Sequence, residues 1–148
     1  MVVFGIEGQH YALRLSAVER VLPMVAVSPL PKAPSVALGV INLHRQVIPV
    51  LDIRSRFDHP PRNYGLAGHL LVARTRERIL ALPVDEVVGV QEAAGETITP
   101  PGTVLPGLGY VEGIVTLADG LIFIHDLDTF LSLDEERRLA EVLEERAG

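Results

Sequence analysis

The sequence contains no cysteine, and Lys32 is its only lysine. The lack of cysteine excludes a disulfide framework, a thiolate metal site and a cysteine nucleophile. Aromatic residues make up only 5% of the chain and the net charge is −6, so the sequence lacks both the stacking rings and the basic stripe of a nucleic-acid surface. We therefore expect a protein partner and no nucleic acid.

Long hydrophobic runs are also missing. No apolar run reaches the roughly 18 residues that a membrane-spanning helix needs, so we expect no direct membrane insertion and a cytoplasmic protein. Apolar residues nevertheless make up 48% of the 148 residues. That content is enough for one domain, or for two very small modules that share a core.

The residue patterns of common catalytic sites are missing as well. No two histidines have the i, i+4 spacing that would direct both imidazoles from one helical face toward a metal. No Gly-x-Ser-x-Gly elbow and no glycine-rich phosphate loop occur. We therefore predict that the chain is not an enzyme and holds no metal or cofactor, and that its histidines are surface or hydrogen-bonded polar residues. The histidines are His10, His44, His59, His69 and His125.

One group of acidic residues has two interpretations. Asp119, Asp126 and Asp128 could form a site for a hard cation. However, Asp126 and its counterpart Asp52 each stand where a predicted strand gives way to a short helical turn. Capping of the helical N–H groups is therefore the favoured role for both residues.

The chain contains an internal repeat, from about residues 1–57 to about residues 70–131. GVINLHRQVIPVLDIRSRF (39–57) aligns with GIVTLADGLIFIHDLDTFL (113–131) at a shift of 74, and VVFGIEGQHYALRLSAVERV (2–21) aligns with residues 71–90 at a shift of 69. Many aligned pairs are identical or exchange one aliphatic residue for another, as equivalent core positions would. A proline-rich connector follows the first segment of each half. We therefore expect the same order of elements twice within one domain, residues 1–148.

Each half predicts short strands joined by turns. Strands are expected at 2–6 and 10–15 around Glu7-Gly8, at 70–75 and 79–84 around 76–78, and at 111–117 and 121–125 around Asp119-Gly120. Closed barrels remove exposed strand edges, which favours them over one open sheet. The predicted fold class is mainly β, with two small barrels side by side and short helices.

A helix is predicted at the C-terminal end, over about residues 133–147. Ser132 followed by Glu135 is a capping-box signature. Leu139, Val142 and Leu143 form a narrow apolar stripe on this helix, which we expect to pack on the flank of a barrel.

The segment PLPKAPSVALGVINLHRQVIPVLDIRSRF resembles the signature of the CheW family of chemotaxis adaptors. In that signature a proline-containing loop leads to a hairpin with Asn-Leu-Arg-Gly, followed by a Pro-hydrophobic-hydrophobic-Asp-hydrophobic-Arg run. YVEGIVTLADGLIFIHDLDTFLS is similar to the closing hairpin and helix of the family, and the resemblance covers residues 2 to about 143.

The resemblance implies two pseudo-symmetric SH3-like five-stranded β-barrels without enzymatic activity. It also implies two partners, the cytoplasmic tip of a methyl-accepting chemoreceptor and the regulatory domain of a CheA-type histidine kinase. The family pattern places Val18, Asn42, His44 and Arg45 on the receptor side. The kinase side is expected on the second hairpin, at Ile114, Leu121 and Ile122.

One motif departs from the family pattern. Where the family has Asn-Leu-Arg-Gly, this chain has Asn42-Leu43-His44-Arg45. Glycine permits a positive φ at no steric cost, whereas Arg45 adopts one only at some cost, which predicts a reshaped hairpin tip. His44 occupies the position of the family arginine, so either Arg45 supplies the charge or the receptor contact has diverged. Val18 could instead be a core residue, repeated at Val87.

Two other functions agree with the same residues. The first is a CheW-like adaptor of a pilus-motility or other non-flagellar chemosensory pathway. The second is a small β-barrel enzyme or ligand-binding protein, which would need a deep polar pocket near Asp52, Asp126 or His125.

Overall fold

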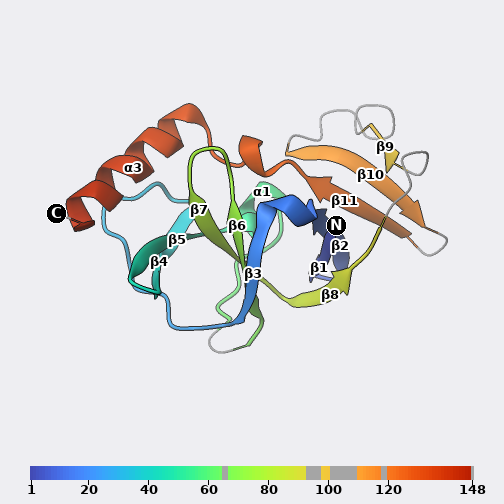
Figure 1. Ribbon diagram of the computed structural model, residues 1–148, viewed down its shortest axis with the longest axis horizontal. Helices are drawn as coiled ribbons and strands as arrows, with labels where there is room; N and C mark the ends of the chain where they lie inside the picture. The colour runs from blue at the N-terminus through green and yellow to red at the C-terminus, as the bar shows by residue number, and fades with distance from the viewer. Residues whose placement is uncertain (65–66, 93–97, 101–109, 118–119, 148) are drawn as a thin grey trace.

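The computed structural model describes residues 1–64, 67–92, 98–100, 110–117 and 120–147. These residues form two curved sheets that lie side by side, with one long helix across the five-stranded sheet (Figure 1). In sheet order, the six-stranded sheet contains β8 (Glu86–Val90), β1 (Val2–Ile6), β2 (Gln9–Leu13), β11 (Gly120–His125), β10 (Val111–Leu117) and β9 (Ile98–Thr99). The five-stranded sheet contains β3 (Val18–Pro23), β6 (His69–Arg74), β7 (Ile79–Val84), β5 (Gln46–Leu51) and β4 (Ala37–Leu43).

The described helices are short except the last one. They are η1 (Leu15–Ala17), α1 (Ile53–Arg56), η3 (Leu127–Thr129) and α3 (Leu133–Ala147). The capping box is confirmed, because the Glu135 N–H donates to Ser132 Oγ at 3.1 Å and the Ser132 N–H donates to Glu135 Oε1 at 2.9 Å. Leu139 is fully buried, and Val142 and Leu143 pack beside it against the core.

The two halves of the sequence exchange strands. The first hairpin, β1–β2, pairs with β10–β11 from the second half, while β6–β7 joins β3, β4 and β5 from the first half. Both exchanges use a parallel strand pair, in which Ala12 lies opposite Ile124 and Ala81 lies opposite Val50. Ala12 aligns with Ala81 and Val50 aligns with Ile124 in the sequence repeat, so the same parallel strand pair forms in both sheets.

The irregularities of pairing are repeated too. The β4–β5 pairing slips by one residue between Ala37 and Gly39, and the β10–β11 pairing slips at the equivalent place, between Val111 and Gly113. The β3–β6 and β1–β8 pairings also share an equivalent slip. β-bulges of this kind increase local twist, which lets short strands curl into a barrel.

The five-stranded sheet closes through the segment after β3. Its two edges are β3 and β4, and Ser28, five residues beyond β3, pairs with Val40 of β4. In the six-stranded sheet the corresponding contact is longer, and Thr99 and Ile98 pair with Ile114 and Val115 as the separate strand β9. This two-residue strand explains why one barrel has six strands where five were expected.

The described residues form three hydrophobic clusters that stabilise the fold. Met24, Ile41, Ile48 and Val72 belong to a cluster of the five-stranded barrel, while Val3, Ala12, Val115, Ile122 and Ile124 form one in the six-stranded barrel. The largest cluster takes residues from both sheets, including Phe4 and Leu13 from one and Leu71 and Leu82 from the other. The two barrels therefore share a common core, and burial of this apolar surface stabilises them as one body.

Candidate partner-binding surfaces

The tip of the β4–β5 hairpin is a two-residue turn. His44 and Arg45 have φ angles of 49° and 67°, and Leu43 pairs with Gln46 across the turn. Two central residues with positive φ are typical of a type I′ turn, whose twist matches that of the flanking strands. The tip is therefore a regular two-residue hairpin turn. The chain keeps the hairpin turn with two non-glycine residues in the left-handed region, which is unfavourable for Arg45.

The predicted receptor-side residues lie on two neighbouring elements. Asn42, His44 and Arg45 are all exposed on the β4–β5 hairpin. Val18 begins β3, and it is partly buried against the common core, as its equivalent Val87 is. Farther along β3, Arg20 Nη1 lies 3.0 Å from His44 Nε2. The structure thus brings β3 and the hairpin tip together, and it adds Arg20, which no sequence motif had indicated.

The kinase-side prediction needs a correction. Ile114 and Ile122 are 0% and 1% exposed, so neither side chain presents a surface to a partner, and Ile122 packs in the cluster of the six-stranded barrel. Only Leu121 keeps an accessible side chain. Their repeat equivalents, Val40 and Ile48, are buried as well. The aliphatic residues that align between the two halves at these positions therefore mark the core and not a binding surface.

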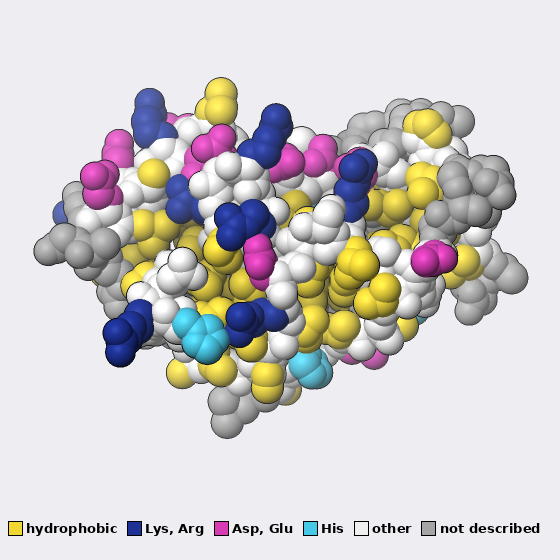
Figure 2. Space-filling model, in the orientation of Figure 1, with side chains coloured by type: hydrophobic (Ala, Val, Ile, Leu, Met, Phe, Trp, Pro, Cys, Tyr) yellow, Lys and Arg dark blue, Asp and Glu magenta, His cyan; other side chains and the backbone are white. Residues whose placement is uncertain are grey.

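Exposed aliphatic side chains gather elsewhere. Figure 2 shows apolar side chains along the middle of one face, over β3 and β8, with basic side chains beside them on the side of the five-stranded barrel. Val21 on β3 and Val88 and Val90 on β8 are exposed. On the second hairpin, Leu117 is exposed close to Leu121 in the sheet. Surface aliphatic groups of this kind are suited to docking a protein partner.

A buried arginine joins the two barrels. Arg54 in α1 is 2% exposed and pairs with Glu7 in the β1–β2 turn and with Asp85 between β7 and β8, both at 2.6 Å. Its Nε donates to the Tyr64 hydroxyl at 2.9 Å. Burial opposes the charge of Arg54, but these hydrogen bonds raise its pKa. Burial would also raise the pKa of Asp85, yet the Glu7 N–H, Tyr64 and Arg54 lower it to about 2.

Two of the aspartates differ from each other. Asp52 caps α1 as expected, because its Oδ1 accepts the Arg54 N–H at 3.1 Å. The side chain of Asp126 makes no cap hydrogen bond at η3, so that prediction is wrong. Instead the Asp126 backbone N–H donates to the Tyr110 carbonyl at 2.6 Å. Asp119 lies outside the described residues, and the described residues contain no group of acidic and histidine side chains that could hold a metal.

His125 contradicts the expectation of a surface or hydrogen-bonded histidine. It is 2% exposed, and neither ring nitrogen has a hydrogen-bond partner. The rings of Phe57, Tyr110 and Phe130 surround it. Burial, with a smaller contribution from the charge of Arg56, lowers the pKa of His125 to about 3, so the imidazole is neutral at pH 7.

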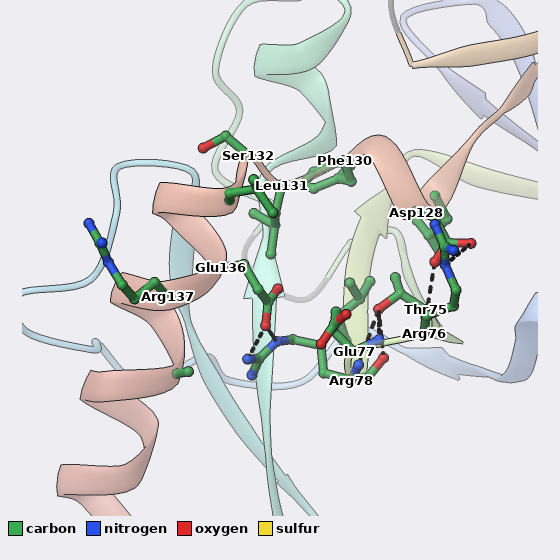
Figure 3. Close-up of a pocket in the computed structure, with 14 residues that line it drawn as sticks. Thr75, Arg76, Glu77, Arg78, Asp128, Phe130, Leu131, Ser132, Glu136 and Arg137 are labelled. Carbon is green, nitrogen blue, oxygen red and sulfur yellow. Dashed lines mark hydrogen bonds and ion pairs between the residues drawn. The ribbon is translucent and has the colours of Figure 1, made fainter.

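The cavities lined by described residues do not support a catalytic site. One of about 730 Å³ is mainly apolar and lies between the connector Met24–Val27 and the segment Pro61–Tyr64. Another, of about 470 Å³, lies between α3 and the β6–β7 turn (Figure 3). There Glu136 accepts a hydrogen bond from Arg78 Nε at 2.7 Å, while Arg137 points away. Neither cavity is lined by Asp52, Asp126 or His125, the residues that a catalytic pocket was expected to include.

The comparisons with known proteins agree with this architecture. The family model of the CheW-like domain matches residues 1–135. The chain belongs to the CheW family. The chemotaxis protein CheW of Rhizobium meliloti is 25% identical over 142 residues, which cover 95% of this chain and 91% of that protein. CheW of Bacillus subtilis is 26% identical over 140 residues, covering 93% and 89%.

A solved structure shows the same fold. The crystal structure of the scaffolding protein TtCheW from Thermoanaerobacter tengcongensis superimposes with a TM-score of 0.81 and 28% sequence identity, over 90% of this chain and 92% of that one. The two-barrel prediction is therefore confirmed. As a CheW-like domain, the chain is an adaptor of chemotaxis signalling. No described helix is both long and apolar enough to cross a membrane.

Proposed function

We propose that this CheW-like chain couples a methyl-accepting chemoreceptor to a CheA-type histidine kinase. The receptor's cytoplasmic tip binds a surface formed by β3 and the β4–β5 tip, which we name the receptor-facing surface. Its residues are Val18, Arg20, Val21, Asn42, His44 and Arg45. The regulatory domain of the kinase binds the second hairpin, at Leu117 and Leu121. The chain does this in the cytoplasm and without catalysis.

The observation that supports this proposal best is the common core of the two barrels. The receptor-facing surface lies on the five-stranded barrel and the β10–β11 hairpin lies on the six-stranded barrel. Both barrels contribute to one hydrophobic cluster, and the buried Arg54 bonds to residues beside both sheets. A body of this kind holds two partners in a fixed relative orientation. A receptor can then change kinase activity only through contacts that differ between its signalling states.

Calorimetry with the purified chain and the regulatory domain of a CheA kinase from the same organism tests the kinase half. We expect one-to-one binding with a dissociation constant on the order of micromolar, which corresponds to roughly −8 kcal/mol. Leu121→Arg should weaken this binding, while Val88→Arg, an exposed aliphatic residue on β8, serves as the matched control. Equal effects of the two substitutions would show that the second hairpin is not part of the kinase interface.

The receptor half is tested with the cytoplasmic tip of a methyl-accepting receptor from the same organism. Binding of both partners at once, as a ternary complex in size-exclusion chromatography, is the expected result. If neither partner binds, the coupling proposal is wrong for this receptor and kinase. Binding to the corresponding proteins of a pilus-motility pathway would then assign the chain to that system.

A further inference from the structure

A cation from another strand lies beside the tip of the β4–β5 hairpin, in addition to Arg45 on the tip itself. Arg20 is an exposed residue of β3, and its Nη1 reaches His44 Nε2 at 3.0 Å. A guanidinium group has only donors, so His44 must accept this hydrogen bond. The imidazole is therefore neutral in this contact, with its proton on Nδ1. The hydrogen bond fixes the guanidinium beside the residue that takes the place of the family's arginine.

No carboxylate in the described part of the chain balances this positive charge. Glu19, the neighbour of Arg20 on β3, accepts a hydrogen bond from Arg74 Nε at 2.8 Å, so its carboxylate is already paired. Among the residues that the structure describes, no carboxylate forms an ion pair with Arg20 or Arg45. Val21, which follows Arg20, is 42% exposed. The surface thus offers a cation next to an aliphatic side chain.

We propose that Arg20, positioned by His44, supplies the recognition cation of the receptor-facing surface. This inference rests on the proposed function and names the partner chemistry of the same surface, a receptor tip that presents a carboxylate. The bond to His44 uses one N–H of Arg20, and the remaining donors of the guanidinium can bind a carboxylate with two parallel hydrogen bonds. His44 acts as a positioning residue, because it holds the guanidinium in place and carries no charge itself.

The test is calorimetric titration of the full chain with the receptor tip fragment at pH 8. Arg20→Gln should weaken binding about tenfold and reduce its salt dependence, because one charged contact is lost. The double variant Arg20→Gln/His44→Arg places a new cation next to the position of the one that was removed, and it should restore affinity to within about threefold of the unmodified chain. Arg138→Gln, at an exposed arginine of α3, is the control that should change nothing.

Three other outcomes would each contradict one part of the proposal. If the unmodified chain binds the receptor tip and Arg20→Gln binds equally well, Arg20 is not the recognition cation. If Arg20→Gln is weaker but the double variant is not rescued, Arg20 acts through local structure and not through its charge. If the unmodified chain binds the kinase domain but no receptor tip, the receptor half of the proposed function fails and this inference fails with it. Unchanged melting temperatures and kinase-domain binding verify that the variants are folded.

Discussion

His125 stands where the repeat alignment places Leu51 in the other half, and both side chains are buried. A leucine there needs no hydrogen bond, whereas His125 leaves two ring nitrogens unpaired. Its pKa falls from 6.5 to about 3 on folding, chiefly because burial disfavours the charged form. The unfolded chain therefore binds a proton at a higher pH than the folded chain does. This makes the folded state progressively less stable as the pH falls from about 6.5 toward 3.

His125→Leu should remove this contribution. Below pH 6.5 the slope of unfolding free energy against pH should decrease by up to about 1.4 kcal/mol per pH unit, while stability at pH 7 is retained or increased. Urea denaturation at pH 7, 5.5 and 4.5 measures the slope. His69→Gln, at an exposed histidine, should leave the slope unchanged. An unaltered slope in His125→Leu would show that His125 is not buried as a neutral group.

Arg45→Gly addresses the strained hairpin tip. Arg45 has a φ of 67°, which glycine adopts without steric cost, although glycine also makes the unfolded chain more flexible. These two effects nearly cancel, so the melting temperature should stay nearly unchanged or rise slightly in differential scanning calorimetry. Gly8→Ala is the opposite change, from glycine at a φ of 78°, and should lower it. A large loss of stability in Arg45→Gly would contradict the turn.

Several residue roles could be predicted because they depend on neighbours in sequence. The Asp52 cap and the Ser132–Glu135 capping box each join residues two or three positions apart. The roles of Arg54 and Arg20 could not be predicted, since their partners lie on other elements. Arg54 was visible in the family signature, but only the fold brings Glu7 and Asp85 to it.

At the scale of elements, the hairpins follow the sequence closely. The strands Val2–Ile6, Ile79–Val84 and Val111–Leu117 have the predicted bounds, because short apolar runs and the turn residues between them are local signals. The faces of the second hairpin were assigned less well. An aliphatic residue at a repeated position fits both a core and a docking surface, and only its burial in the folded chain shows that Ile114 is covered.

Helix α3 provides a matched pair of leucines. Leu139 is fully buried in the common core, whereas Leu133, at the start of the helix, is 93% exposed. Leu139→Ala should destabilise the chain by about 2–4 kcal/mol, since it removes buried methyl groups and leaves a cavity. Leu133→Ala should change stability by less than about 0.5 kcal/mol. Chemical denaturation of both variants checks this, and similar losses would mean that α3 does not dock through Leu139.

At the scale of the whole molecule, the sequence repeat predicts two similar units but not the exchange of strands between them. Either half could form its own sheet from the same local patterns, because strand pairing across the chain depends on contacts far apart in sequence. The exchange places each hairpin turn of one sheet against the short helix that follows the other sheet. Glu7 meets Arg54 at one of these junctions, and Arg76 meets Asp128 at the equivalent one.

The two junctions carry the same ion pair with the charges reversed, but in different surroundings. Arg54 is buried and also bonds to Asp85 and Tyr64, whereas Arg76 lies on the surface, with its Nε 3.7 Å from Asp128 Oδ2. Removal of one partner from a buried pair leaves the other charge uncompensated, while exposed pairs contribute little. The first junction should therefore contribute far more to the union of the barrels.

Arg54→Met and Arg76→Met test this difference. Arg54→Met should lower the unfolding free energy at pH 7 by about 3 kcal/mol, and Arg76→Met by less than about 1 kcal/mol. The folded-state pKa of Asp85, about 2 in the unmodified chain, should rise in Arg54→Met. In the unmodified chain, ionised Asp85 contributes stability above pH 3.8, and this contribution is lost as the pH falls toward 2. The contribution should be smaller in Arg54→Met. Urea denaturation at pH 7 and pH 3 measures both effects. Equal losses in the two variants would mean that the barrels are joined by their common hydrophobic core alone, with Arg54 contributing no more than a surface charge.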